Sequence, residues 1–342
     1  MAKTSIVTLV LIASLFAIVP RAQRQASLES EAACRTLDLA SINAPAPKNP
    51  NVVVMRWLAT SNFEIAYRDN IFLLDAFYDR TPPARPLGFD FKKMVKATAI
   101  LIGHAHDDHI SDAVALAKQT GAPVYGGPQT YEFVKANGLP DHQAVLTRGG
   151  EAHTFKGVTI RAVLAHHSVR EGSQYQRAAQ DFRDMETALL RPRTPEEEAH
   201  ERAISQRGSR DQRLQDEGTI GFLFTFDGGY TLYYQDSAGP ITEAQRALAT
   251  TVAPVDAAIV AYQGFFLSQP QIDATMPLVR LWKPTTLVLN HHDETGGRFL
   301  DMATEPFFMA VRDELPRTRG YGLLYRSPMC IDAVNKRIFV GP

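Results

Sequence analysis

Short apolar runs alternate with helix-like stretches along most of the chain, and several of the runs end in a His or an Asp. Short runs of this kind, bounded by Gly, Pro, Asn or Asp, are typical of strands. The predicted strands are residues 52–57, 63–67, 71–75, 97–102, 123–125, 144–146, 151–155, 158–164, 219–226, 230–234, 257–261 and 286–289. The predicted helices are residues 112–119, 128–137, 173–190, 195–206, 241–249, 271–281 and 305–314. This alternation predicts an α/β protein built as a layered αββα sandwich, with polar side chains gathered along one edge of two sheets.

The densest group of polar side chains follows the apolar run at residues 97–102. Four groups that can bind a metal, His104, His106, Asp108 and His109, fall within six positions. In an extended segment, His104 and His106 project to the same side. Asp108 and His109 are adjacent, so they point in different directions wherever the chain turns. Because neutral imidazole suits zinc and a carboxylate adds a hard anionic ligand, the segment predicts a metal site on a loop that a rigid sheet supports.

The pattern His-x-His-x-Asp-His after an apolar strand resembles the metallo-β-lactamase superfamily. Four further segments resemble that family's motifs in the expected order: an opening hairpin with a structural aspartate at Asp75, a third-histidine motif at His166-His167-Ser168, a bridging-aspartate motif at Gln235-Asp236-Ser237, and a last-histidine motif at Asn290-His291-His292-Asp293. The resemblance covers residues 51–342. It implies one hydrolase domain with the four-layer αββα metallo-β-lactamase sandwich.

The resemblance also implies a ligand set for two metal ions. One ion is held by His104, His106 and one of His166 or His167, the other by Asp108, His109 and one of His291 or His292, and Asp236 bridges both. His167 is preferred because the family's third histidine often directly precedes Ser. His291 is preferred because relatives place an aromatic residue just after the ligand, and His292 then fills that place. The expected ions are two Zn²⁺ per chain, and Mn²⁺ or iron suits the same ligands.

The expected bridging carboxylate, Asp236, indicates which nucleophile the site would use. It brings two cations within roughly 4 Å, where a shared water becomes hydroxide near neutral pH. The resemblance therefore implies a two-metal-dependent hydrolase whose metal-bridging hydroxide cleaves an ester, lactone or phosphodiester bond. Asp108 and Asp236 are the expected catalytic carboxylates, and His292 and Tyr262 are candidates for the general acid that protonates the leaving group.

Asp236 also limits which branches of the family the chain resembles. The lactam-cleaving branches generally lack it, so β-lactam hydrolysis is disfavoured. The chain resembles most the branch that includes sugar-phosphate lactonases and N-acylphosphatidylethanolamine-type phospholipases. The alternative function on the same fold is an iron-binding oxidoreductase or a non-catalytic metal-binding protein. Iron enzymes of the superfamily usually need a partner flavin or persulfide chemistry, and no fused flavin domain is visible in the sequence.

Charge and composition indicate what kind of partner to expect. The 342 residues are 45% hydrophobic, which is enough for a large core in one domain. Lys plus Arg number 36 and Asp plus Glu 37, for a formal charge of −1, so no net basic field recruits nucleic acid. The expected partner is a small-molecule substrate.

The N-terminal segment indicates a destination in the cell. Residues 5–19 are apolar apart from Ser and Thr, and about fifteen such residues fit a signal peptide better than a membrane span. Residues 1–22 are therefore interpreted as a signal peptide or, alternatively, a retained membrane anchor, and residues 23–50 as an extended arm. The protein is expected in the periplasm or outside the cell. Cys34 and Cys330 can pair there, but their distance cannot be read from sequence.

A segment at about residues 170–217 separates the third histidine from the bridging aspartate. It is rich in Arg, Glu and Gln and nearly free of β-branched residues, which indicates a helical insertion. Two interpretations stay open. The insertion forms a lid or an arm for a homo-oligomer, or it is a solvated helical segment without substrate contact.

Overall fold

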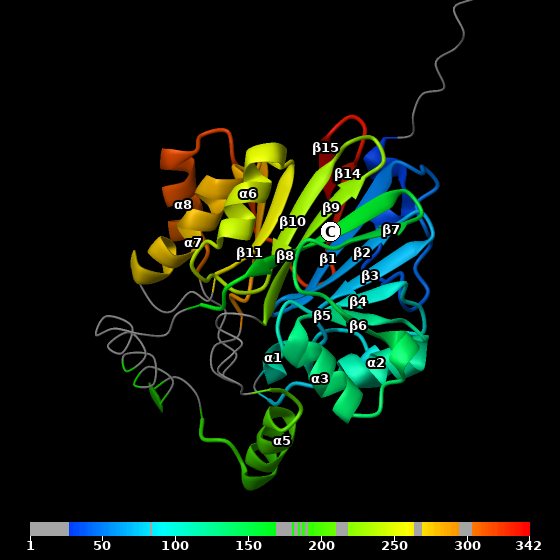
Figure 1. Ribbon diagram of the computed structural model, residues 1–342, viewed down its shortest axis with the longest axis vertical. Coiled ribbons are helices and arrows are strands. Elements are labelled where there is room, and N and C mark those ends of the chain that lie inside the picture. The colour runs from blue at the N-terminus through cyan, green and yellow to red at the C-terminus, as the bar shows by residue number, and fades with distance from the viewer. Residues whose placement is uncertain are drawn as a thin grey trace, which may run out of the picture.

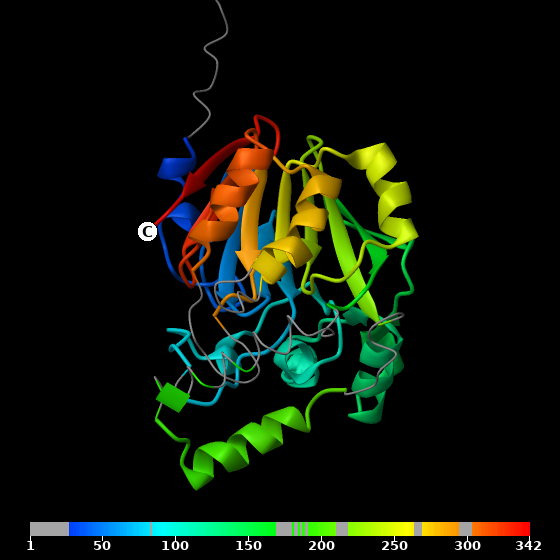
Figure 2. The ribbon, with the colours of Figure 1, turned by 90° about the vertical axis from the view of Figure 1, so that its left-hand side faces the viewer.

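The computed structural model describes residues 27–82, 84–168, 180, 184, 187–188, 191–209, 218–262, 269–293 and 303–342. Figures 1 and 2 show two sheets packed against each other, with helices on their outer sides. The first sheet has the strand order β15-β14-β1-β2-β3-β4-β5-β6 and the second has β13-β12-β11-β10-β9-β8-β7. Both sheets mix parallel and antiparallel pairs.

The strands of the first sheet are β1 (Val52–Ala59), β2 (Asn62–Tyr67), β3 (Asn70–Leu74), β4 (Ala99–Leu101), β5 (Val124–Gly126), β6 (Ala144–Leu146), β14 (Pro328–Asp332) and β15 (Arg337–Val340). Those of the second are β7 (Ala152–Phe155), β8 (Val158–Ala165), β9 (Thr219–Phe226), β10 (Thr231–Gln235), β11 (Ala257–Ala261), β12 (Thr286–Asn290) and β13 (Arg319–Tyr321). The helices are α1 (Asp107–Ile110), α2 (Ala113–Thr120), α3 (Pro128–Ala136), α5 (Pro195–Ser205), α6 (Glu243–Val252), α7 (Gln269–Trp282) and α8 (Glu305–Glu314).

The main core lies between the two sheets. Because side chains alternate along a strand, every second residue of β1 to β3 faces the other sheet. Phe63 and Phe72 are fully buried there. Their rings meet Tyr234 and Phe224 of the second sheet edge to face, with centroids 6.4 Å and 5.7 Å apart. This apolar layer holds the two sheets, and the residues at their ends, in one fixed relation.

Two further apolar layers lie outside the sheets. Leu116 of α2 and Val134 of α3 pack on the outer face of the first sheet. Trp282 of α7 and Phe307 of α8 pack on the outer face of the second, where Tyr233 stacks on Trp282 at 4.1 Å. The αββα sandwich expected from the sequence is confirmed. Among the described helices, none has the length and apolar character that crossing a bilayer requires.

Residues 27–50 lie against the outer face of the first sheet. The buried Glu64 carboxylate accepts hydrogen bonds from the backbone N–H groups of Ala40 and Ser41, both at 2.8 Å. Cys34, at the end of a short 3₁₀ turn, forms a disulfide with Cys330 of β14, with a Cα–Cα distance of 5.9 Å. The pairing that the sequence left open is therefore present. The signal-peptide interpretation of residues 1–22 lies outside the described residues.

The last strands differ most from the pattern read along the sequence. No predicted range corresponds to β13, β14 or β15. The chain returns after α8 to add β13 to the second sheet, and then pairs β14 antiparallel with β1, with Val54 opposite Cys330. The first sheet therefore combines strands from both ends of the chain.

Candidate metal centre

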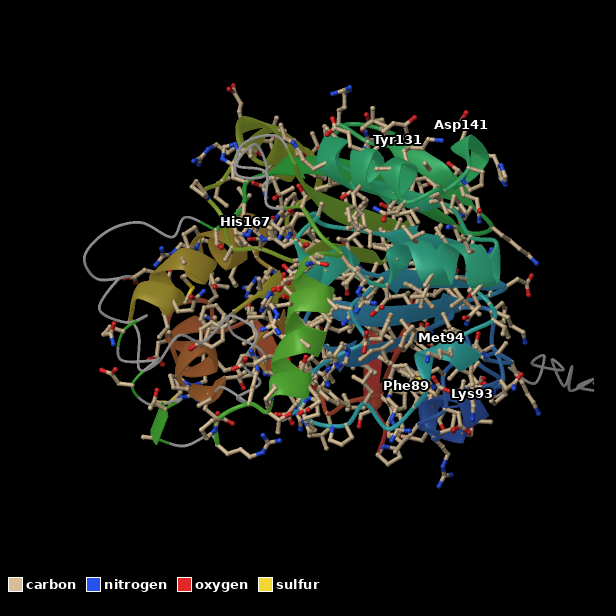
Figure 3. The ribbon with its side chains drawn as sticks, turned by 90° about the horizontal axis from the view of Figure 1, so that it is seen from below. Phe89, Lys93, Met94, Tyr131, Asp141 and His167 are labelled. Atoms are coloured by element: carbon tan, nitrogen blue, oxygen red, sulfur yellow. A yellow bond between two sulfur atoms is a disulfide. The ribbon has the colours of Figure 1, made fainter. Side chains whose placement is uncertain are left out.

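The candidate ligands lie where strands of both sheets end. Asp75 follows β3, His104 follows β4, His167 follows β8, Asp236 follows β10 and His291 follows β12. Figure 3 views this edge from below and labels His167. Loops that leave one edge of a packed sandwich can carry residues distant in sequence to one point, and a rigid core then holds them there.

The structure brings all seven predicted ligands together. They form three groups whose ligand atoms lie within 4.8 Å of one another: His104, His106 and His167; His104, His109 and Asp236; and Asp108, His109 and His291. The groups are linked, because one histidine is shared by the first two and another by the last two. The third-histidine and last-histidine choices made from the sequence, His167 and His291, are the members that join these groups.

A single helical turn presents two of the ligands. His106 stands at the N-cap of α1, and its carbonyl accepts hydrogen bonds from the N–H groups of His109 and Ile110, both at 3.0 Å. Asp108 and His109 lie inside this turn, so adjacent side chains leave it in different directions. The sequence pattern predicted a loop for both residues. The short helix was missed because four residues are too few to show a helical repeat of apolar positions.

Asp75 connects three parts of the site. One carboxylate oxygen accepts from the N–H of Gly103 at 2.8 Å, and the other lies 2.8 Å from Nδ1 of His109. The Tyr234 hydroxyl donates to the second oxygen at 2.7 Å. Because Nδ1 of His109 is engaged, its Nε2 faces Asp108, 3.6 Å away. Partners of this kind set ring orientation at metal sites.

Two further contacts around His109 and Tyr234 were not predicted from the sequence. The Ser61 hydroxyl lies 2.8 Å from Nδ1 of His109, and the Tyr234 hydroxyl also lies 3.0 Å from the Ser61 carbonyl. Tyr234 lies in β10, two positions before Asp236, and side chains two apart in an extended segment project to the same side. That spacing was the one available signal.

His291 adopts a backbone conformation that is rare for a non-glycine residue, with φ = 62°. Its N–H donates to the Thr60 carbonyl at 2.8 Å, and the Thr60 N–H donates to Oδ1 of Asp293 at 2.9 Å. Arg80 approaches Oδ2 of Asp293 at 3.2 Å. These contacts hold the strained turn, and strain of this kind is common at functional sites.

Burial and the balance of charge define the electrostatics. Burial lowers the pKa of His104 to about 3, so its ring is neutral at pH 7. Burial alone would raise the pKa of Asp236, but the imidazoles of His104 and His109 outweigh it and hold that pKa well below its usual range. Burial and the Asp236 carboxylate raise the pKa of Asp75. Buried carboxylates among imidazoles form a site that favours cations.

The donor set fits two metal ions. Oδ2 of Asp236 lies 2.7 Å from Nδ1 of His104, while its buried Oδ1 has no hydrogen-bond partner among the described residues. A buried carboxylate oxygen left in this way is costly unless a cation completes it. Gly103 supplies the space, because a Cβ there would lie 2.1 Å from Cγ of Asp236. Five imidazoles and two carboxylates form a ligand set typical of zinc.

Gly103→Ala is expected to weaken metal binding. Its methyl group would occupy the place of the Asp236 carboxylate and displace it from the ligands. We expect metal affinity to fall by about 10- to 100-fold, the usual cost of disturbing groups that orient ligands. Titration of the metal-free protein with zinc in the presence of a competing chelator measures the change.

The control variant needs a glycine that tolerates a side chain. Gly121→Ala cannot serve as control because φ there is 76°. Gly322→Ala can, because no atom lies within 4 Å of its added Cβ, and equal losses in both variants would contradict the expectation.

The two residues suggested for proton transfer differ in their surroundings: His292 directly follows the ligand His291, whereas Tyr262 lies in the apolar layer outside the second sheet. The ring of His292 lies against that of Trp57, with centroids 4.3 Å apart and the ring planes tilted by 33°. Tyr262 is buried, and its ring lies 4.9 Å from that of Phe307. His166 is partly buried and belongs to none of the three ligand groups. The general-acid role of His292 or Tyr262 stays a prediction.

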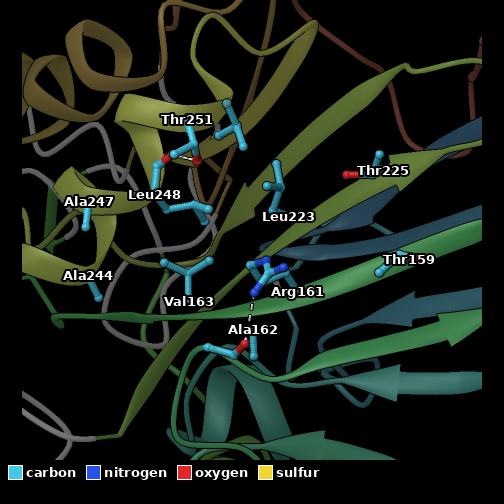
Figure 4. Close-up of a pocket in the computed structure, with 12 residues that line it drawn as sticks. Thr159, Arg161, Ala162, Val163, Leu223, Thr225, Ala244, Ala247, Leu248 and Thr251 are labelled. Atoms are coloured by element: carbon cyan, nitrogen blue, oxygen red, sulfur yellow. Dashed lines mark hydrogen bonds between the residues drawn. The ribbon is translucent and has the colours of Figure 1, made fainter.

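A separate surface pocket lies between α6 and the outer face of β8 and β9 (Figure 4). Val163, Leu223 and Leu248 supply apolar lining, and Arg161 donates to the Gly150 carbonyl at 3.1 Å. None of the candidate ligands lines this pocket. It therefore plays no part in the candidate metal centre.

Comparison with known proteins agrees with this fold. The profile of the beta-lactamase superfamily domain matches residues 70–189. A UPF0173 metal-dependent hydrolase from Myxococcus xanthus is 31% identical over 194 residues, which are 57% of this chain and 55% of that protein. Another from Thermoplasma volcanium is 33% identical over 119 residues, which are 35% of this chain and 50% of that protein. The chain thus spans about half the length of the curated relatives it matches.

Solved structures share the architecture. Igni18, a metallo hydrolase from the archaeon Ignicoccus hospitalis, aligns over 82% of this chain and 98% of its own, with a TM-score of 0.57 and 15% identity. An isothiocyanate hydrolase from Delia radicum gut bacteria aligns over 81% of this chain and 98% of its own, with a TM-score of 0.50 and 11% identity. An αββα sandwich with a His- and Asp-lined edge defines the class of metallo-β-lactamase folds. The chain has this fold, and its residues 70–189 match the beta-lactamase superfamily domain.

Proposed function

We propose that the protein is a two-metal-dependent hydrolase that cleaves an ester, lactone or phosphodiester bond. The observation that carries the proposal is the linked arrangement of three ligand groups, with Asp236 in the middle one. His104, His106 and His167 would hold one cation, and Asp108, His109 and His291 would hold the other. Asp236 belongs to the group that links these two sets of ligands. The curated relatives bear the name metal-dependent hydrolase, which supports the same reaction class here.

The protein's own contribution is to hold these side chains in one geometry. When bound, the cations supply Lewis acidity and lower the pKa of water, which makes a nucleophile available at neutral pH. Asp75 keeps His109 oriented through Nδ1, and the Tyr234 hydroxyl holds Asp75 in turn. The low pKa of His104 leaves its ring neutral, which is the form that binds a metal. The apolar core beneath the site keeps this arrangement rigid.

The class of bond follows from Asp236. The lactam-cleaving branches of the superfamily generally lack this aspartate, and here it is buried among imidazoles at the centre of the site. We therefore propose hydrolysis of an ester, lactone or phosphodiester rather than of a β-lactam. Zinc is the proposed cation because imidazoles outnumber carboxylates in the ligand set.

A hydrolysis panel tests the proposal. Purified protein is incubated with a lactone, an aryl ester, a phosphodiester and a β-lactam, with and without chelator. We expect turnover of at least one of the first three substrates, loss of that turnover with chelator, and its return on adding zinc or manganese. Turnover that is insensitive to chelator, or turnover of the β-lactam alone, would contradict the proposal.

An iron-dependent oxidoreductase is the second candidate, because one protein with a similar fold is a diiron enzyme by name. CmlA, a diiron beta-hydroxylase from Streptomyces venezuelae, aligns over 82% of this chain and 54% of its own, with a TM-score of 0.51 and 12% identity. Metal analysis of purified protein separates the candidates. Zinc or manganese supports hydrolysis, and two irons per chain would support the oxidoreductase.

We propose that the protein acts in the periplasm or outside the cell. The disulfide between Cys34 and Cys330 supports this destination, because disulfides form and persist in oxidising compartments. A small-molecule substrate is the proposed partner. Assembly into a homo-oligomer through the helical insertion stays a prediction.

A further inference from the structure

Residues 208–209 of the insertion contact the loop that carries four of the candidate ligands. We name residues 103–109 the metal loop. The Ser209 N–H donates to the carbonyl of Ala105 at 2.6 Å. A Cβ on Gly208 would lie 2.4 Å from the backbone nitrogen of Asp107 and 2.6 Å from its Cα. Backbone therefore meets backbone here, and residues 208–209 restrict the path that the metal loop can take.

Arg207, directly before this contact, forms ion pairs with two carboxylates, those of Asp79 and Asp112. Nη2 of Arg207 lies 2.6 Å from Oδ2 of Asp79, and Nη1 lies 3.2 Å from Oδ1 of Asp112. Asp112 is buried, and its Oδ2 accepts from the N–H groups of Tyr78 and Asp79 at 2.7 Å and 2.9 Å. The planar guanidinium thus bridges two carboxylates from different segments, a geometry that Lys cannot reproduce.

The helix that leads to this point also packs on its own chain. Figures 2 and 3 show α5 lying across the lower end of the molecule. Ile204 is its buried residue and packs against Phe77. Nε2 of His200 lies 2.9 Å from Oδ1 of Asp79. The same loop, residues 77–81, therefore receives both α5 and the arginine that follows it.

We propose that Arg207 and Gly208 are positioning residues for the metal loop, and that α5 is a docked part of the site's scaffold. The proposal rests on the proposed function only in that the metal loop binds cations. A ligand loop that is held in place before binding loses less conformational freedom when a cation arrives. The insertion thus contributes to metal affinity although it supplies no ligand among the described residues.

Metal affinity and local hydrogen exchange test this inference. The variants are Gly208→Ala, which places a methyl group against Asp107, and Arg207→Gln, which removes the bridge at a side chain that is 36% exposed. Gly322→Ala is the matched control, since that glycine is exposed and no atom lies within 4 Å of its added Cβ. Zinc affinity is measured by chelator competition, and exchange is followed in the peptide that spans the metal loop.

Both test variants should bind zinc about 10-fold more weakly than wild type, in line with other groups that orient ligands without touching the metal. Exchange in the metal loop should be faster in both, whereas Gly322→Ala should match wild type in both measurements. Wild-type affinity and exchange in Arg207→Gln would overturn the inference, whether or not Gly208→Ala folds. If wild type binds no cation, the proposed function fails, and the exchange comparison still tests the positioning role separately.

Discussion

Asp236→Ala is expected to lose metal binding and to lower hydrolytic activity by about 1,000-fold or more, while the fold is kept. Oδ2 of this carboxylate lies 2.7 Å from Nδ1 of His104 and 3.2 Å from Nδ1 of His109. It is the only carboxylate of the ligand group that joins the other two. Without it, five imidazoles and Asp108 remain, and a single ligand carboxylate is left to offset the repulsion between two cations at close range. The core survives because its apolar layers contain no part of Asp236.

Metal content, activity and circular dichroism measure this change together. Asp227→Ala is a matched control in the neighbouring turn, because Asp227 is exposed and pairs with Arg68 at the surface. That variant should keep metal and activity. If Asp236→Ala still bound two ions per chain at wild-type affinity, the carboxylate could not have the bridging role.

Removing both cysteines is expected to destabilise the protein by about 3 to 5 kcal/mol, because the disulfide closes a loop of 296 residues in the unfolded chain. The midpoint of thermal unfolding should fall by about 10 °C. Cys34→Ala with Cys330→Ala is compared with wild type by denaturation in guanidinium. Activity of the folded variant should remain, since the disulfide lies on the outer face of the first sheet among residues such as Val54.

The same experiment under reducing conditions is its control. With dithiothreitol present throughout, most of the difference in unfolding free energy should disappear, and what remains reports the lost packing of two buried side chains. Equal stability of wild type and variant without reductant would contradict the expectation. So would two free thiols in unreduced, denatured wild type.

The sequence predicted the fold and the site best where an apolar strand is followed by a candidate metal ligand. The apolar run before His104 predicted β4, and β9 and β11 were predicted with the bounds that the structure has. The two linked choices between neighbouring histidines, His167 over His166 and His291 over His292, came from the resemblance to the superfamily. The structure then placed the preferred members in the ligand groups.

Other features depend on contacts between distant segments, which one sequence does not display. The strained φ of His291 is held by Thr60, more than two hundred positions earlier in the chain. The support of Asp75 by Tyr234 crosses from one sheet to the other. β14 and β15 extend the first sheet because β14 pairs with the edge of β1 that β2 leaves free, and periodicity carries no information on such pairing. The docking of the insertion on the metal loop through Arg207 is of the same kind.

Anomalous diffraction from crystals of the zinc-loaded protein tests the central claim most directly. We predict two anomalous peaks per chain, about 3.5 to 4 Å apart, one beside His104, His106 and His167 and the other beside Asp108, His109 and His291. A single peak, or peaks placed away from these side chains, would contradict a two-metal centre at this edge of the sandwich.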